Sequence, residues 1–264
     1  MRPSIIDIGV NLTNRAFDQD REEAAVRAEA AGVSPLIITG TSVASSRKAA
    51  DYAGLYPGKM YATAGVHPHD VKGCGADTLG TLRKLAALPQ VVAIGECGLD
   101  YNRDFSPRDV QRRWFREQIK LAEELDMPLF LHERDAHGDF AAIMREHPEM
   151  IGKSVVHCFT GTGEELRTYL EMGFRIGITG WICDERRGQH LRELVKEIPL
   201  ERLMIETDAP YLTPRDMRPK PKGGRNEPAF LVHILETVAS CMGMEAEDVA
   251  AGTARTTKAF FRIE

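Results

Sequence analysis

The sequence predicts a protein of the α/β class, folded as a (β/α)8 TIM barrel. Short apolar segments alternate with longer amphipathic segments along all 264 residues. The apolar segments are continuous, which indicates parallel strands that are covered on both faces. Eight such segments can close a barrel in one domain, which we place at residues 1–264. An open, doubly wound parallel sheet is the alternative that this pattern leaves.

The predicted strands are rich in Val, Ile and Leu, and each ends near a glycine or a polar residue. They span residues 4–9, 35–40, 60–66, 91–96, 128–132, 154–159, 175–180 and 202–208. One stretch after the eighth strand, residues 213–228, is rich in Pro, Gly and basic residues. Its composition and length indicate a functional loop rather than a linker between domains.

Helical patterns lie between and after these strands. The most clearly bounded ones are at residues 18–32, 106–126, 227–242 and 245–261. Gly32 is typical of a helix end, and Ser106 is the expected N-cap of the second helix, with Pro107 at its first helical position.

The composition limits the class of protein. With 43% hydrophobic and 28% charged residues the chain can bury a sizeable core, and a net charge of -5 argues against a sequence-independent coat for DNA. Neither a secretory leader nor a run of ~20 apolar residues is present, so we expect a cytoplasmic protein without a membrane span. Five cysteines without a C-x-x-C pair indicate neither disulfides nor structural zinc. We expect a monomer.

Polar residues at the carboxyl ends of the strands are the candidates for a functional site, because active sites of barrels lie there. Four of the eight histidines fall at these ends, together with several carboxylates. The residues concerned are Gly9, Asn11, His67, His69, Glu96, His132, Glu133, Arg134, His157, Trp181, Asp184, Glu206 and Asp208.

Imidazole and carboxylate together are ligands for Zn²⁺, Mn²⁺ or Mg²⁺, and a cation with an open position activates water. Glu96 follows the apolar run "VVAIG", where a carboxylate is costly to bury without a cation. Asp208 follows "LMIET" in the same manner and is placed to orient or deprotonate a water molecule. The pattern therefore predicts a metallohydrolase.

Seven motifs, in order along nearly the whole chain, resemble the signatures of the TatD family of metal-dependent deoxyribonucleases. They are "AGVHPHD" (64–70), "AIGECGLDY" (93–101), "MPLFLHERDA" (127–136), "VVHCFTGT" (155–162), "IGITGW" (176–181), "IETDAPYL" (205–212) and "RNEP" (225–228). The resemblance implies a 3'-to-5' exonuclease that prefers single-stranded DNA, with RNA as a possible further substrate, and that uses Mg²⁺. It also associates the chain with DNA repair or nucleic-acid turnover.

Carried over motif by motif, the resemblance assigns metal ligation to Glu96, His132 and His157, and a water-orienting or ligand role to Asp208. His67 would contact the scissile phosphate, and we expect Arg134 to help. The basic loop at 213–228 suggests a track for the nucleic-acid backbone, with Arg225 as its strongest candidate.

One departure from the family pattern bears on the metal. Many relatives carry a His-x-His pair after the first strand, whereas "DIGVNLT" has Gly9 and Asn11 at those positions. Glycine cannot ligate through a side chain, and asparagine offers an oxygen suited to a hard ion. We therefore expect Mg²⁺, with Mn²⁺ or Zn²⁺ as alternatives.

Two other functions remain open from sequence. An amidohydrolase-type enzyme acting on a small molecule would share the rim of histidines, but it commonly needs the missing His-x-His pair and a carbamylated lysine. A non-catalytic partner protein could keep the barrel with a reduced metal site. The retention of Glu96, His132, His157 and Asp208 argues against the second, because clustered polar groups are costly to bury.

Overall fold

The computed structural model describes residues 4–264, with the backbone alone for Lys222. Eight parallel strands form one sheet in the order of the chain. They are β1 (Ile5–Val10), β2 (Val33–Ile38), β3 (Met60–Ala64), β4 (Val91–Asp100), β5 (Leu129–Arg134), β6 (Ser154–Val156), β7 (Arg175–Ile178) and β8 (Leu203–Ile205). The (β/α)8 prediction is confirmed.

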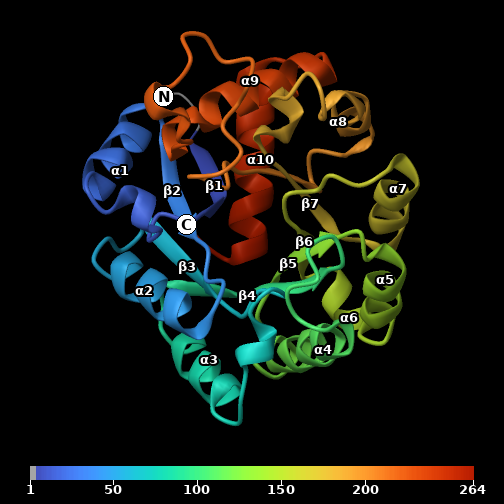
Figure 1. Cartoon of the computed structure of the whole chain (residues 1–264). Helices are drawn as coiled ribbons and strands as arrows, with labels where there is room; N and C mark the ends of the chain where they lie inside the picture. The colour runs from blue at the N-terminus through green and yellow to red at the C-terminus, as the bar shows by residue number, and fades with distance from the viewer. Residues whose placement is uncertain (1–3) are drawn as a thin grey trace.

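Helices surround the sheet as a ring (Figure 1). They are α1 (Arg21–Ala30), α2 (Val43–Ala53), α3 (Thr78–Ala86), α4 (Arg108–Glu124), α5 (His137–Arg145), α6 (Pro148–Ile151), α7 (Gly163–Met172), α8 (Gln189–Leu194), α9 (Leu231–Met242) and α10 (Ala246–Phe261). Short 3-10 turns occur at Arg15–Phe17, Val71–Gly73, Gly180–Cys183, Val195–Glu197, Lys222–Gly224 and Pro228–Phe230.

The sheet closes between its last and first strands. The backbone N–H of Asp208 donates to the Gly9 carbonyl at 2.8 Å, and that of Asn11 donates to the Ala209 carbonyl at 2.7 Å. Because β8 returns to β1, the alternative of an open, doubly wound sheet is wrong. Residues that are far apart in sequence, 9–11 and 206–209, are thereby brought together at the carboxyl end of the barrel.

The barrel interior is filled by apolar side chains and closed at one end by α10. Phe260 and Phe261, at the end of this helix, pack with an interior cluster made of Ile8, Ile37, Val92, Ala93, Phe130, Val155 and Met204. Figure 1 shows α10 crossing over the strands near the middle of the view. The barrel is therefore a packed core, and its open face for chemistry is the opposite, carboxyl end.

No single helix in residues 4–264 has the length and apolar character of a membrane span. The bent pair Pro228–Met242 and Ala246–Phe261 passes a test of length and composition when the two are taken together. Both helices of this pair bury apolar side chains against the barrel.

The fourth strand is longer than the sequence suggested. The prediction ended it at residue 96, whereas β4 continues to Asp100 and stays paired with β5, Gly98 opposite His132 and Asp100 opposite Arg134. Gly98 has φ +145°, and a Cβ atom there would clash with the backbone of His132. Gly98 therefore permits the close approach of two strands.

The predicted N-cap of the helix at 106–126 is also corrected. Helix α4 begins at Arg108 with Pro107 in the capping position. The Ser106 hydroxyl donates to the His69 carbonyl at 2.8 Å and accepts from the Lys72 N–H at 3.2 Å. Ser106 therefore ties the loop after β4 to the loop after β3.

Candidate metal centre

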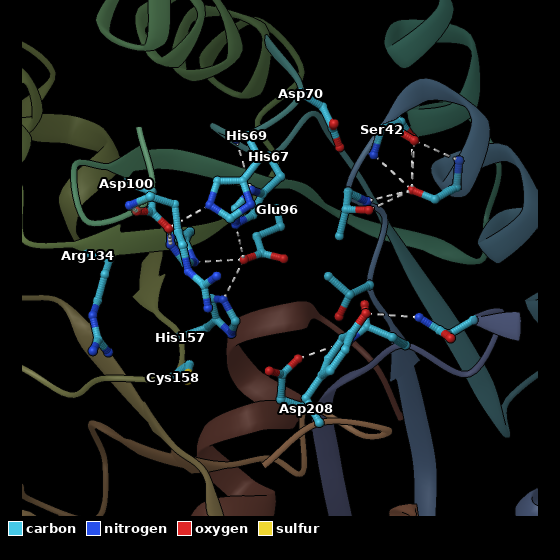
Figure 2. Close-up of a pocket in the computed structure, with 18 of the residues that line it drawn as sticks. Ser42, His67, His69, Asp70, Glu96, Asp100, Arg134, His157, Cys158 and Asp208 are labelled. Atoms are coloured by element: carbon cyan, nitrogen blue, oxygen red, sulfur yellow. Dashed lines mark hydrogen bonds and ion pairs between the residues drawn. The ribbon is translucent and has the colours of Figure 1, made fainter. Parts of the chain in front are cut away.

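Side chains from the carboxyl ends of the strands line one cavity of about 730 Å³ (Figure 2). The strand-end residues that line it include Asn11, Thr39, His67, His69, Glu96, Asp100, His132, Arg134, His157, Trp181 and Asp208. The rim predicted from the sequence is therefore one continuous site.

Glu96 lies at the centre of this site. Its Oε1 atom is 2.7 Å from Nε2 of His157, 3.0 Å from Nδ1 of His132 and 3.3 Å from Nε2 of His67. Only 6% of Glu96 is exposed. No lysine or arginine pairs with it in residues 4–264, so three imidazoles supply all the side-chain contacts that offset its burial.

The histidines and Glu96 set one another's protonation. Burial would raise the pKa of Glu96, but His157 and His67 hold that pKa well below its usual value. Burial would also lower the pKa of His157, yet the charges of Glu96 and Glu206 raise it well above the ordinary histidine value. Burial does lower the pKa of His67, which is therefore neutral at pH 7.

Asp100 is a site residue that the sequence did not reveal. Its Oδ2 atom lies 2.8 Å from Nε2 of His69 and 3.2 Å from Nε2 of His132. Burial opposes its ionisation, but these two histidines hold its pKa well below the usual value. The available signal was spacing: Asp100 follows Glu96 by four residues, which places both side chains on one face of a strand.

Glu206 supports His157 from behind. Its Oε2 atom is 3.3 Å from Nδ1 of His157, and its Oε1 atom accepts from the Cys158 N–H at 2.6 Å. Glu206 is completely buried. A Cβ atom at Gly9 would clash with Oε2 of Glu206, so the missing side chain at position 9 leaves the space that this carboxylate occupies.

Asp208 faces the same cavity from the β8 side. Its Oδ1 atom accepts from Nδ2 of Asn11 at 2.9 Å. Burial, assisted by the charges of Glu96 and Glu206 and opposed by His157, raises the pKa of Asp208 to about 7. Asp208 therefore exchanges a proton near neutral pH.

Asp7 is a further carboxyl group on this side, and it lies beneath the site. Its Oδ2 atom accepts from the Thr207 hydroxyl at 2.5 Å, and its Oδ1 atom accepts from the backbone N–H groups of Thr207 and Gly9. Burial raises the pKa of Asp7 to about 8. These bonds fix the segment that carries Asp208.

The two predicted arginines occupy different places. Arg134 lines the cavity, and its Nη1 donates to the Thr160 hydroxyl at 2.7 Å. Arg225 is not among the cavity-lining residues: its guanidinium forms bonds of 2.6 and 2.7 Å with Asp20 and lies over the Phe17 ring. The structure thus separates Arg225 from the rest of the predicted site and binds the loop to the β1–α1 segment through it.

The donor set fits a divalent cation. His67, Glu96 and His132 each offer a ligand atom, and these atoms all lie within 4.8 Å of one another. His157 contacts the same Glu96 oxygen, and the oxygens of Asp208 face the same cavity. A mixture of imidazole and carboxylate around one buried point is chemistry that favours a divalent metal.

A parallel barrel with histidines and carboxylates converging at its carboxyl mouth defines a metallohydrolase. The profile of the family described as "TatD related DNase" matches residues 6–262. The chain belongs to this family, and it is therefore a nuclease, a hydrolase of phosphodiester bonds.

Individual relatives agree with this assignment. A protein of Pantoea sp. (strain At-9b), named "3'-5' ssDNA/RNA exonuclease TatD", is 53% identical over 260 residues, which cover 98% of this chain and 100% of the relative. Among solved structures, the TatD homologue YJJV of Escherichia coli is 27% identical with a TM-score of 0.91 and full coverage of both chains. A TatD family hydrolase of Entamoeba histolytica is 28% identical with a TM-score of 0.88, and 98% of each chain is covered.

Proposed function

We propose that this nuclease is a metal-dependent exonuclease that removes nucleotides from the 3' end of single-stranded DNA and also accepts RNA. The observation that carries the proposal is Glu96, a buried carboxylate that faces three histidines in the cavity of a TatD-family barrel. The names of relatives that are about half identical over their full length support the polarity and the substrate.

The proposed ligands are Glu96, His132, His157 and Asp208. A divalent cation bound there supplies a Lewis acid for the phosphate and lowers the pKa of an attacking water. Positions 9 and 11 offer no imidazole, so the further ligands are the oxygens of Asp208 and Asn11. Oxygen ligands favour Mg²⁺, with Mn²⁺ or Zn²⁺ as substitutes.

Asp208 is the proposed general base. Its pKa of about 7 lets it accept the proton of the attacking water near neutral pH. The hydrogen bond that Nδ2 of Asn11 donates to Oδ1 at 2.9 Å orients the carboxylate, and Oδ2 has no hydrogen-bond partner among the described residues.

His67 is the proposed contact for the scissile phosphate. Its Nδ1 accepts from the His69 N–H at 3.1 Å, so the proton of the neutral ring lies on Nε2, which points toward the centre of the site. A neutral N–H donor can stabilise charge that develops on a phosphate oxygen. Arg134, on the β5 side of the cavity, adds positive charge that would attract the phosphates of the nucleic-acid strand.

Asp100 is the proposed positioning residue for His132. It lies 3.2 Å from Nε2 of His132, so Nδ1 of that ring is left facing Glu96. A carboxylate that holds one nitrogen of a ligand histidine fixes its tautomer and its orientation.

Small-molecule hydrolysis of the amidohydrolase type is disfavoured by the cavity lining. The one lysine that lines the cavity in residues 4–264 is Lys48, which lies on α2 rather than at a strand end. Lys153, at the start of β6, pairs with Asp126 instead. We propose nucleic-acid repair or turnover in the cytoplasm, by a monomer, as the biological setting.

The test uses 5'-labelled single-stranded DNA, with a duplex and an RNA as parallel substrates. Protein stripped of metal and resupplied with Mg²⁺, Mn²⁺ or Zn²⁺ should shorten the single strand stepwise from its 3' end, and the Glu96→Gln variant should not. Absence of cleavage with every ion, in protein shown to be folded by circular dichroism, would refute the proposal.

A further inference from the structure

The cavity extends beyond the candidate metal centre to the corner between β2 and α2. Thr39, Thr41, Ser42, Ala44, Ser45 and Lys48 line it there. Figure 2 shows Ser42 and Arg134 on opposite sides of the Glu96 carboxylate. The proposed catalytic groups do not include any residue of this corner.

Two backbone hydrogen bonds fix the corner to the site. The Glu96 N–H donates to the Gly40 carbonyl at 2.7 Å, and the His67 N–H donates to the Thr41 carbonyl at 2.9 Å. A group bound at the corner is therefore held next to the scissile phosphate that His67 would contact.

Thr39 gives the first sign of a ligand. It is 3% exposed, and its hydroxyl has no hydrogen-bond partner within residues 4–264, yet its side chain lines the cavity. Because no other group of the described chain bonds this hydroxyl, it is free to donate to a ligand oxygen in the cavity. A threonine hydroxyl donates readily to a phosphate oxygen.

The N-terminus of α2 gives the second sign. This helix of 11 residues begins at Val43, and its first turn contains no acidic residue. The Ser45 N–H donates to the Ser42 hydroxyl, which leaves the N–H groups of Val43 and Ala44 without a partner in the described chain. Such groups, together with the helix dipole, favour an anion.

Lys48 supplies the charge. It is exposed, it lines the cavity, and it makes no ion pair within the part of the chain that the structure describes. The exposed Asp70 also lies on this side of the cavity (Figure 2), so the positive charge of the corner depends on Lys48.

We propose that this corner, formed by Thr39, the N-terminus of α2 and Lys48, is a subsite for a second phosphate of the nucleic-acid strand. The inference rests on the proposed exonuclease function. A 3'-terminal nucleotide with a free 3'-hydroxyl carries no phosphate beyond the scissile bond. The second phosphate is therefore the neighbour on the 5' side, and the corner holds the strand that remains.

The test compares two thymidine dinucleotides. TpT contains the scissile phosphate alone, whereas pTpT adds the neighbouring phosphate on the 5' side. For the wild-type protein, kcat/KM should be at least about tenfold higher for pTpT than for TpT, which is the effect of a hydrogen-bonded charge contact. Thr39→Val and Lys48→Gln should each remove most of this preference.

Lys84→Gln is the matched control. Lys84 is an exposed lysine on α3 that makes no ion pair in the described residues and does not line the cavity. It changes the net charge equally, and it should keep the wild-type preference for pTpT. Thermal unfolding midpoints of the three variants establish that each is folded.

The proposal is overturned if the wild type shows no preference for pTpT, or if Thr39→Val and Lys48→Gln reduce kcat/KM equally for both dinucleotides. Calorimetric binding of TpT and pTpT to metal-free protein separates the subsite from the activity. If the wild type cuts no substrate, the exonuclease proposal fails. The subsite is then judged from binding alone: tighter binding of pTpT than of TpT that Thr39→Val and Lys48→Gln reduce supports it. Equal affinities of the wild type for the two dinucleotides refute it.

Discussion

Carboxyl groups on the two sides of the cavity rim have pKa values that are shifted in opposite directions. On the β3–β6 side, Glu96 and Asp100 lie against histidines that hold their pKa values below the usual range. On the β8–β1 side, Asp7 and Asp208 have pKa values raised to about 8 and about 7. Glu96, Asp100 and Asp7 are buried and Asp208 is half-buried, and the direction of each pKa shift follows from the neighbours of the group.

The neighbours explain the contrast because burial acts on every carboxyl group in the same direction. Imidazoles offset it for Glu96 and Asp100, whereas Asp7 meets only uncharged donors of Thr207 and Gly9. Gly9 and Asn11 add no charge on the β8–β1 side, and for Asp208 the charge of His157 only partly offsets burial. The residues beside each buried carboxyl group, rather than burial itself, therefore decide whether it is ionised.

The largest effect on activity should follow from removing the charge of Glu96, on the β3–β6 side of the rim. Glu96→Gln keeps the size of the side chain but leaves three histidines without their shared carboxylate, and we expect kcat/KM to fall by at least about 10³-fold. Steady-state cleavage of single-stranded DNA measures it. Glu133→Gln, on the same strand as His132 but absent from the cavity lining, is the control and should change activity by less than about threefold.

The second largest effect on activity should follow from replacing Asp208, on the β8–β1 side of the rim. Asp208→Asn removes the proposed base, and a loss of about 10²-fold in kcat/KM is expected. Because a base acts in its ionised form, the wild-type rate should rise with pH as Asp208 loses its proton, and the variant should lack that rise. A pH profile that is identical in the two proteins would assign the proton transfer to another group.

The contrast also predicts how stability depends on pH. The pKa of Asp7 is raised to about 8 in the folded protein, so between pH 4 and pH 8 the unfolded chain releases a proton that the folded chain retains. Stability should therefore fall with rising pH through this window, by up to about 1.4 kcal/mol per unit. Urea unfolding at pH 5 and pH 8 measures this slope, and Asp7→Asn should flatten it.

The smallest effect concerns the boundary between the two sides of the rim. Gly9→Ala places a methyl group against Glu206, and we expect a loss of about 2 kcal/mol in the free energy of unfolding. In a Glu206→Ala background the same change should cost less, because the space is free. Additive losses in this double-mutant cycle would contradict the direct contact.

Much of the fold was predictable from local patterns. The eight strands are continuous apolar segments, and the observed bounds of most of them fall within a few residues of the predicted ones. The exception is β4, which continues to Asp100 because residues 97–100 stay paired with β5, a partner that local composition does not reveal. Gly98 permits this close packing of the two strands, since a Cβ atom there would clash with the backbone of His132.

Much of the candidate site was predictable in the same way, since the carboxyl ends of barrel strands must meet. His67, Glu96, His132, His157, Arg134 and Asp208 all line one cavity, as the strand ends indicated. Arg225 did not join them, because its charge is satisfied by Asp20 from a segment about two hundred residues earlier. A local basic composition does not reveal such a distant partner.

The sequence by itself therefore determined the barrel, its nuclease family and the rim from which the chemistry comes, because strand periodicity and short motifs are local properties of the chain. Only the tertiary structure decided that Asp100 joins two histidines, that Glu206 fills the space at Gly9, and which carboxyl groups keep their protons. Those outcomes depend on burial and on distances between residues that are remote in sequence.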